Sequence, residues 1–449
     1  MPPNCCHARS ASLTLTDTQQ SVLDPAGNRA TQRTKLNSNQ IRGFWAAWGG
    51  WCLDGMDSFI YALVLVPALR ELLPRSGIAA STGEIGYYGG IMFALFLVGW
   101  GLSLLWGPIG DRFGRVRTLM LTILCYSIFT WACAFVTNVW QLAAFRLLGG
   151  IGIGGEWTIG GTFIAEEWPE DRRKMGAGLM HTGYYFGFFL AALLNATVGA
   201  HFGWRAMFAV GGFPAMLVIF IRKGVHEPKR WKPAESTVRA MRMLFTKEYR
   251  KRTILNSLYL LVSIIGLWAG SVYSPAALTF LAGKAGLSST GAVRIASFGT
   301  VLLGLGTVLG CLAVPPLAER FGRRWTQAFF FTLMLLSISL GFGYAFYMQE
   351  HALQWFLVLV FVMGFGGANQ AMYSLWFPEQ YRTECRASAF GFATSVGRFV
   401  CAGFTFLVGA GVSHYQTIGI PVAMTSLAFV VGLALLPWGV ETKGQPLPD

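Results

Sequence analysis

Residues 43–69 read GFWAAWGGWCLDGMDSFIYALVLVPAL, an apolar run in which Asp54 and Asp57 are the only charged residues. The run exceeds the ~20 residues that an α-helix needs to cross a bilayer. A charged side chain at bilayer depth costs roughly 2.5–3.5 kcal/mol, so it requires a water-filled cavity, a partner or a proton. Three residues apart, the two carboxylates share one helix face. The run therefore predicts a membrane-spanning helix with a functional acidic pair.

The composition extends this prediction to the whole chain. It has 449 residues, of which 54% are hydrophobic and 12% are charged, whereas soluble domains are about 25% charged. We therefore expect an all-α membrane protein with twelve transmembrane helices in two six-helix bundles related by a pseudo-two-fold axis. The spans are expected at 43–69, 85–106, 117–136, 139–165, 174–199, 204–222, 253–280, 295–317, 325–347, 353–377, 386–411 and 416–438.

Basic residues indicate the orientation. Lys and Arg number 35 against 21 Asp and Glu, a net charge of +14, and most of them lie in alternate loops on one side. By the positive-inside rule this side is cytoplasmic, so both termini are expected there, in a bacterial inner (cell) membrane. No basic face interleaved with aromatic residues stands apart from the loops, which excludes nucleic-acid binding.

The polar segments divide the chain. Residues 1–42 lack a signal peptide and are expected to form a disordered cytoplasmic tail. Residues 43–222 and 253–438 are the N-terminal and C-terminal bundles. Residues 223–252 form a basic cytoplasmic linker, either solvated or containing a short amphipathic helix on the lipid surface at 238–245. Residues 439–449 form a second cytoplasmic tail.

The two halves repeat loop sequences at a nearly constant offset. Residues 107–117 read GPIGDRFGRVR and residues 315–325 read PPLAERFGRRW, whereas 168–173 read WPEDRR and 377–382 read FPEQYR. Such a repeat indicates parallel duplication of a six-helix unit, an architecture in which a transporter's site lies between the halves.

These motifs resemble those of the major facilitator superfamily. The loop motif after the second helix matches at Gly107, Gly110, Asp111, Arg112, Gly114, Arg115 and Arg117. The fourth-helix motif R-x-x-x-G-x-G matches at Arg146, Gly150 and Gly152, and the E-x-x-R elements at Glu170/Arg173 and Glu379/Arg382. Asp54 and Asp57 are similar to the DGxD of its aromatic-acid and sialate proton-symporter families. Because the seventh helix lacks the polar motif of that branch's monocarboxylate carriers, the substrate stays open.

The resemblance implies proton symport of a small organic anion by alternating access, with a sialate, an aromatic acid or another metabolite as the substrate. Asp54 and Asp57 are the candidates for proton coupling, with Asp57 favoured. The alternative is that a basic residue pairs with them and locks two helices. Arg398 lies near the middle of the eleventh helix, where it either binds the substrate carboxylate or pairs with one of the aspartates.

The fourth helix carries two further proton-coupling candidates. The family motif links Arg146 to proton transfer, although it could instead bond to carbonyls of neighbouring helices. Glu156 is either a second relay carboxylate or part of the cytoplasmic gate. The run GGIGIGG at 149–155 contains a dinucleotide-binding pattern, but no strand precedes it, so it predicts close helix packing instead.

Other polar residues complete the candidate sites. Pro275 is expected to kink or break the seventh helix, and His181 is expected to be a satisfied polar residue. Gly107 and Gly114 are expected to supply a tight turn. Further substrate candidates are Asn369, Gln370, Tyr373, Trp268, Tyr273, Tyr184 and Tyr185. The cytoplasmic gate is expected to comprise Gly107, Asp111, Arg112, Gly114, Arg115, Glu170, Arg173, Glu319, Arg320, Arg323, Glu379 and Arg382.

Two alternatives to anion symport stay open, a sugar or polyol carrier and a non-transporting membrane sensor. No arrangement of residues resembles a catalytic centre, so an enzyme is not expected. We expect no cofactor and no metal, because the cycle is driven by a proton gradient. The eight cysteines form no CxxC pair, and Cys5 and Cys6 lie in the tail. The protein is expected to be a monomer whose partners are the substrate, protons and lipid.

Overall fold

The apolar run that opens the sequence forms the middle of the first helix, α1 (Ser38–Arg75). The helix begins where the Asn37 side chain accepts a hydrogen bond from the backbone N–H of Gln40, which satisfies one unpaired donor of the first turn. Its axis bends by 63° between Leu65 and Pro67. Proline lacks the N–H that would continue the helical ladder, and its ring crowds the preceding turn. The sequence did not predict this bend.

The computed structural model describes residues 34–233, 236–415 and 417–448, and Cys5 and Cys6 lie outside them. From Leu36 onward, the described residues form one compact unit. All its regular elements are helical within the described ranges. After α1 they are α2 (Thr82–Leu102), η1 (Ser103–Leu105), α3 (Trp106–Phe113), α4 (Arg115–Ala132), η2 (Cys133–Phe135), α5 (Val139–Glu167), α6 (Arg173–Leu194), η3 (Asn195–Gly199), α7 (Ala200–Val210), α8 (Ala215–Gly224), α9 (Thr237–Met243), α10 (Arg250–Lys284), α11 (Ser289–Phe321), α12 (Arg323–Gly343), η4 (Ala345–Tyr347), α13 (Ala352–Gly367), η5 (Ala368–Gln370), α14 (Ala371–Trp376), η6 (Pro378–Gln380), α15 (Arg386–Tyr415), α16 (Gly419–Thr425), α17 (Leu427–Leu435) and η7 (Leu436–Trp438).

Several of these helices are suited to a bilayer. In the described part of the chain, eight helical stretches are long and apolar enough to cross a membrane, or nine if the bent α1 is one span. Three more helices, α5, α10 and α15, have 29, 35 and 30 residues. At ~1.5 Å per residue each of them exceeds the thickness of a bilayer core.

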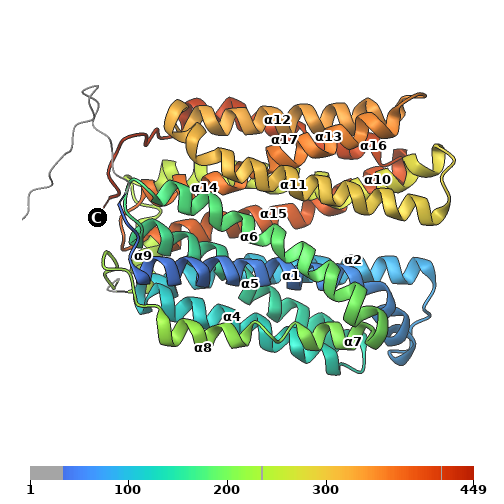
Figure 1. The fold of residues 1–449 in the computed structure, drawn as a ribbon, viewed down its shortest axis with the longest axis horizontal. Helices are drawn as coiled ribbons and strands as arrows, with labels where there is room; N and C mark the ends of the chain where they lie inside the picture. Colours follow the sequence, from blue (N-terminus) through green and yellow to red (C-terminus); the bar gives the residue numbers. More distant parts are fainter. Residues whose placement is uncertain (1–33, 234–235, 416, 449) are drawn as a thin grey trace, which may run out of the picture. The chain divides into compact units, whose positions relative to one another are not determined.

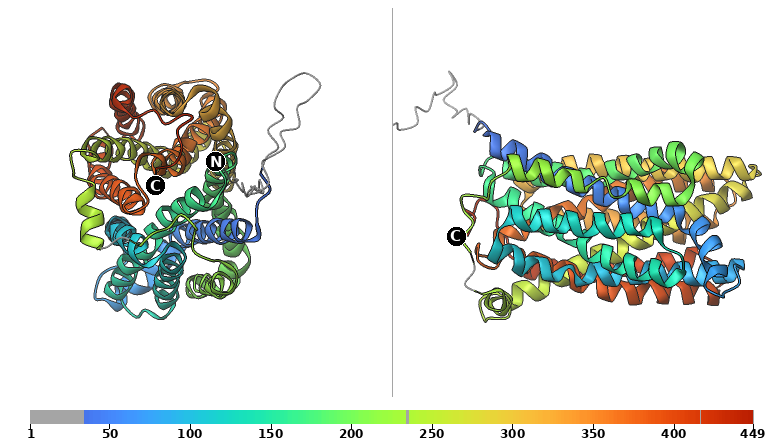
Figure 2. Two further views of the ribbon diagram at one scale, coloured as in Figure 1. Left: turned by 90° about the vertical axis from the view of Figure 1, so that its left-hand side faces the viewer. Right: turned by 90° about the horizontal axis from the view of Figure 1, so that it is seen from below.

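The helices run side by side, with those of the first half on one side and most of those after α9 on the other (Figures 1 and 2). Within the first half, α1 packs against α5 and α6, and α5 also packs against α2 and α4. Within the second half, α11 packs against α10 and α13, and α10 also packs against α15. The halves meet where α15 contacts α2, α3 and α5, and where α6 contacts α11 and α14.

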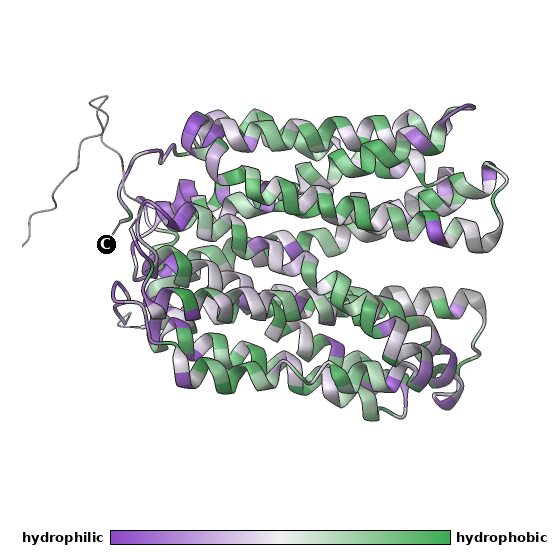
Figure 3. Cartoon of the chain, viewed as in Figure 1, coloured by the Kyte–Doolittle hydropathy of each residue, from purple (hydrophilic) through white to green (hydrophobic). Residues whose placement is uncertain are grey.

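Polar residues gather at the ends of the helices, densely where residues 439–448 lie (Figure 3). We call this the basic end; it carries residues 111–117, 166–173, 319–325 and 378–386. The middle of the helices is apolar, and large side chains such as Leu305 (46% exposed) and Leu336 (49% exposed) lie on the outer surface there. A surface of this kind matches acyl chains rather than water.

Glycines set how closely the helices approach. A Cβ at Gly55 would overlap the Tyr184 carbonyl, so α1 and α6 touch backbone to backbone. In the same way, Gly150 lies against the carbonyl of Phe96 and Gly152 against the backbone of Tyr126. The prediction that residues 149–155 serve close packing is confirmed.

Two local expectations differ from the structure. Helix α10 continues through Pro275, so of the expected kink or break the break does not occur. The break occurs instead in the sixth predicted span, between α7 and α8, where residues 211–214 read GGFP. In the linker, a short helix is present as α9, but it differs from the expected helix on the lipid surface, because its buried Ala240 packs with Leu244 against Tyr381 and Cys385 of the protein.

Candidate functional site

The two aspartates of α1 face the interior. Both are fully buried (0% exposed), and α1 presents their side towards α5 and α6 rather than lipid. Gly187 on α6 lies against the Cys52 carbonyl, one turn from Asp57. A carboxylate so enclosed is shielded from acyl chains by protein on every side, as intramembrane acidic groups must be.

Asp57 pairs with Arg146 of α5. Their side chains approach to 3.4 Å, and both are fully buried. The guanidinium lies 4.6 Å from the ring centroids of Tyr61 and of Phe96, which hold it between two aromatic faces. Within the described residues, Nε and Nη2 of Arg146 make no hydrogen bond. In this conformation Asp57 therefore follows the structural alternative, in which a basic residue pairs with the aspartate and joins two helices.

Asp54 lies beside a second carboxylate. Glu156 of α5 accepts a hydrogen bond from the Thr122 hydroxyl (2.8 Å), and its Oε2 lies against α1 at Gly50, one turn before Asp54. The charges of Glu156 and Asp57 both act on Asp54. Neither oxygen of Asp54 has a hydrogen-bond partner among the residues the structure describes. Two buried carboxylates whose charges act on each other disfavour being ionised together, so one of them is readily protonated.

Of the two alternatives for Arg398 of α15, the ion pair with an aspartate is not formed in this structure. Neither aspartate bonds to Arg398, because Asp54 has no hydrogen-bond partner among the described residues and Asp57 pairs with Arg146. The charges of Arg398 and Asp54 still interact through space. The Arg398 guanidinium instead lies 4.1 Å from the Trp100 ring centroid and 5.7 Å from that of Trp157. Arg398 is 4% exposed, and its Nη1 has no partner in the described part of the protein. A buried guanidinium with an unused donor, and with no carboxylate paired to it, is able to bind an anion.

An aromatic cluster surrounds this guanidinium. Trp157 stacks on Trp51 (5.8 Å between centroids), and Trp51 lies 4.8 Å from Tyr184. Phe390 of α15 meets the edge of Trp157 at 5.3 Å. The Trp157 Nε1–H donates to the Ser374 hydroxyl (2.8 Å), which ties α5 to α14 across the two halves. The sequence analysis missed these tryptophans, although Trp51 and Trp157 lie on the same helices as Asp54 and Glu156.

The remaining substrate candidates differ in their location and in whether their polar atoms are already hydrogen-bonded. Tyr373 uses its hydroxyl within the second half, where it donates to the Tyr259 carbonyl and accepts from Gln327 Nε2. Asn369 and Gln370 are buried and each keeps one polar atom without a partner among the described residues. His181 and Tyr185 lie beside the aromatic cluster. The buried His181 Nδ1 has no partner among the described residues, so the expectation that this side chain is satisfied is wrong. Tyr273 is half-buried, and the Trp268 side chain lies outside the described part.

At the basic end, a buried ion network joins the two halves. Arg115 bonds to Asp111 (2.7 Å) and to both oxygens of Glu166 (2.8 and 3.0 Å). Glu166 also accepts from Arg386 of α15 (2.8 Å), and Asp111 accepts from the backbone N–H of Ser388 (2.8 Å). Every member is buried, so charge and hydrogen bonding hold the halves together at this end. Glu166 and Arg386 were not predicted.

The second repeat forms a smaller network. Arg323 pairs with Glu379 at 2.6 Å, and Glu379 also lies 3.5 Å from Arg173 of the first half. Arg173 bonds to Glu170 as well (3.2 Å). Glu319 pairs with Lys174 (3.1 Å) rather than with an arginine of its own loop. Three expected gate residues form no ion pair among the described residues, namely Arg112, Arg320 and Arg382.

The loop glycines act differently from one another. Gly114 and Gly322 have φ of 111° and 86°, values that L side chains rarely adopt, and they form the turns before α4 and α12. Gly107 forms no turn, which corrects the expectation. It lies inside α3, where a Cβ would come within 2.7 Å of the Ala387 carbonyl of α15.

Two further glutamates cap the helices that follow these turns. Glu227 accepts from the backbone N–H groups of Arg115 (2.7 Å) and Val116 (3.1 Å). Glu441 accepts in the same way from Arg323 (2.9 Å), at the start of α12. A carboxylate at a helix N-terminus satisfies free donors and opposes the positive end of the helix dipole. Neither glutamate was predicted, although their equivalent positions in the sequence, shortly after the last helix of each half, could have indicated this shared role.

The family model described as Major Facilitator Superfamily matches residues 47–405. A protein named as a probable 4-methylmuconolactone transporter from Cupriavidus pinatubonensis is 31% identical over 90% of this chain and 91% of its own length. The niacin transporter NiaP of Acinetobacter baylyi is 28% identical, covering 90% and 94%. A structure of the proton:xylose symporter XylE, from E. coli, superposes with a TM-score of 0.75 at 19% identity, covering 91% and 98%.

Proposed function

Because this chain belongs to the major facilitator superfamily, we propose that it carries a small organic acid across the cell membrane in symport with protons. Twelve spans form two six-helix bundles, residues 43–222 and 253–438, related by a pseudo-two-fold axis. The nine apolar spans and the three long helices α5, α10 and α15 together support this count. The basic end faces the cytoplasm, as the positive-inside rule requires.

The observation that carries the proposal is Arg398. Its planar guanidinium is suited to a carboxylate, and its buried Nη1 has no partner among the described residues. Trp100 and Trp157 flank it, so a planar ring or conjugated chain attached to that carboxylate would stack on indole faces. The substrate class is therefore a planar, unsaturated carboxylic acid. The names of the relatives, which refer to methylmuconolactone and niacin, support the same chemistry.

The proton is taken up by the Asp54–Glu156 pair. Both carboxylates are buried and their charges interact, and among the described residues no ion pair neutralises Asp54. Asp57 is already balanced by Arg146, so we assign coupling to Asp54 in place of the Asp57 favoured by the sequence. Protonation of the pair removes negative charge near Arg398, which then holds the substrate carboxylate more strongly.

Alternating access accounts for the state of the basic end. The pairs Glu166–Arg386 and Arg173–Glu379 cross between the halves and are buried, which corresponds to a carrier closed towards the cytoplasm. Opening requires these pairs to separate and to become solvated. The halves then rock about the substrate, as two bundles around a fixed central site.

The test is uptake into proteoliposomes with an imposed pH gradient, acidic outside, with radiolabelled nicotinate as the probe and nicotinamide as its uncharged control. We expect nicotinate to accumulate and nicotinamide not to. Arg398→Lys keeps the charge but loses the planar fork, so the KM should rise about 30-fold for a loss of ~2 kcal/mol. Arg294→Gln, an exposed arginine of α11, is the matched control and should leave the KM unchanged.

Asp54→Asn separates coupling from binding. We expect it to abolish accumulation driven by the pH gradient while substrate exchange across the membrane continues. Persisting accumulation in Asp54→Asn would remove the coupling assignment. Thermal stabilisation by xylose but by no carboxylic acid in a panel of sialate, hydroxybenzoate, lactate and nicotinate would favour the sugar-carrier alternative instead.

A further inference from the structure

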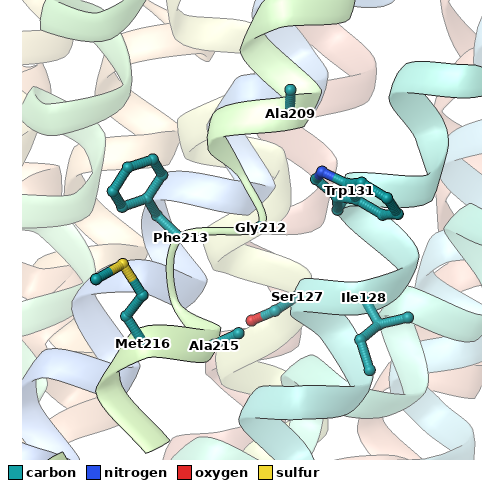
Figure 4. Close-up of a pocket in the computed structure, with 8 residues that line it drawn as sticks. All are labelled: Ser127, Ile128, Trp131, Ala209, Gly212, Phe213, Ala215 and Met216. Carbon is teal, nitrogen blue, oxygen red and sulfur yellow. The ribbon is translucent and has the colours of Figure 1, made fainter. Parts of the chain in front are cut away.

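A groove runs along the outer surface of the first half, between α4 and the broken pair α7/α8. Its volume is about 380 Å³. Small residues, Ala209, Gly212 and Ala215, leave the space open, whereas Trp131 lines one side and Phe213 the other (Figure 4).

The break between α7 and α8 creates this groove. Gly211 and Gly212 bring the chain so close to α4 that a Cβ at Gly212 would lie 2.9 Å from the Trp131 ring. The bulky side chains turn outward, and Trp131 (49% exposed) and Phe213 (63% exposed) lie at the surface. Both walls belong to apolar spans, Arg115–Phe135 and His201–Ile221, so the groove opens towards acyl chains.

A second hollow continues the groove to the end of the helices opposite the basic end. It has a volume of about 580 Å³ and shares Ala209 with the first. Two arginines line it, Arg75 at the end of α1 and Arg205 of α7. Both contact Glu71, at 3.0 and 2.9 Å, so one carboxylate faces two guanidinium groups and the hollow keeps a net positive charge.

The two arginines differ in freedom. Arg205 is fixed, because its Nη1 donates to the carbonyls of Ala134 (2.8 Å) and Val136 (3.0 Å). The Arg75 side chain is 52% exposed, so it can turn towards a ligand. A fixed and an adaptable guanidinium together match the oxygens of a phosphate group.

We propose that this groove binds one anionic phospholipid, with its phosphate at Arg75 and Arg205 and one acyl chain along α4 and α8. An acyl chain gains little by leaving bulk lipid for an apolar groove, so the charged hollow provides the selectivity for an anionic headgroup. The site lies in the leaflet away from the basic end and is independent of the proposed transport function.

Native mass spectrometry of the full chain in detergent tests the proposal, with dioleoylphosphatidylglycerol, dioleoylphosphatidylcholine and inorganic phosphate as probes. We expect one phosphatidylglycerol to bind at least ten times more tightly than phosphatidylcholine, and inorganic phosphate alone not to bind. Arg75→Gln should remove most of this preference. Ala209→Leu, which fills the shared wall, should weaken both lipids.

The controls keep the test decisive. Arg294→Gln and Ala192→Leu change an exposed arginine and an exposed alanine of other helices and should leave lipid binding unchanged. Arg75 contributes little to the core, so a folding failure is not expected in its variant. Equal binding of the two lipids, or an Arg75→Gln variant that retains the preference, would overturn the proposal, as would inorganic phosphate binding as tightly as the lipid.

Discussion

Glu166 offers a direct test of the proposed gate at the basic end. Glu166→Gln removes the charge from a buried side chain that accepts hydrogen bonds from Arg115 of its own half and from Arg386 of the other. The Arg115 contact exists whichever way the halves are arranged, so only the Arg386 contact is specific to the closed state. A hydrogen bond to a charged group contributes about 1.5–3 kcal/mol. We take ~2 kcal/mol, which shifts the closed-to-open equilibrium about 30-fold towards the open state.

The assay is a distance distribution between spin labels on the two halves. Arg117→Cys and Arg382→Cys place labels on exposed residues on either side of the gate, in a background without other cysteines. We expect Glu166→Gln to increase the long-distance population. Glu167→Gln is the matched control, because among the described residues the Glu167 carboxylate accepts hydrogen bonds from Asn39 and from the backbone N–H of Lys229, neither of which belongs to the second half. An unchanged distribution in Glu166→Gln, or an equal change in Glu167→Gln, would refute the reasoning.

Two further predictions concern the same end of the molecule. Gly322→Ala forces a side chain into a backbone with φ of 86° and towards Glu441, so it should cost about 1–3 kcal/mol and lower the apparent Tm, whereas Gly283→Ala, which meets nothing within 4 Å, should not. Equal Tm values for the two variants would contradict this reading of the turn. Burial raises the pKa of the Cys385 thiol to about 12, so only about one thiol in 10⁴–10⁵ is ionised near pH 7.5. Because the thiolate is the reactive form, N-ethylmaleimide should modify Cys385 very slowly at this pH, and the rate of modification should rise with pH. Mass spectrometry of the intact protein measures the rate of modification, and the exposed thiol of Arg382→Cys serves as the fast control. Rapid modification of Cys385 at pH 7.5 would count against a closed gate.

The sequence predicted the features that depend on local pattern. An apolar run identifies a helix in lipid, and Asp54 and Asp57 inside such a run had to be buried. The close packing of residues 149–155 also follows from composition alone, since small side chains permit close approach. Each of these predictions needs only one helix and its environment.

The sequence did not predict which charged residues of different helices form ion pairs. The repeat aligns Glu170 with Glu379, yet Arg115 binds Glu166, one turn earlier, while Arg323 binds Glu379. One helical turn moves a carboxylate by about 5.4 Å, more than the length of an ion pair. Duplicated motifs therefore indicated where charges gather, but the packing of α5 against α4 and α15 decided which charges meet.

The capping carboxylate Glu441 has a practical consequence for anyone who handles this protein. Around it, Thr442 and Leu447 are 1% and 4% exposed, and Arg386 donates a hydrogen bond to the Pro448 carbonyl. An affinity tag or fluorescent reporter inserted between residues 440 and 448 would displace this buried segment from the proposed gate. The equilibrium between the closed and open states would then shift before any substrate is added. Fusions are better attached ahead of Asn37, where α1 has not yet begun.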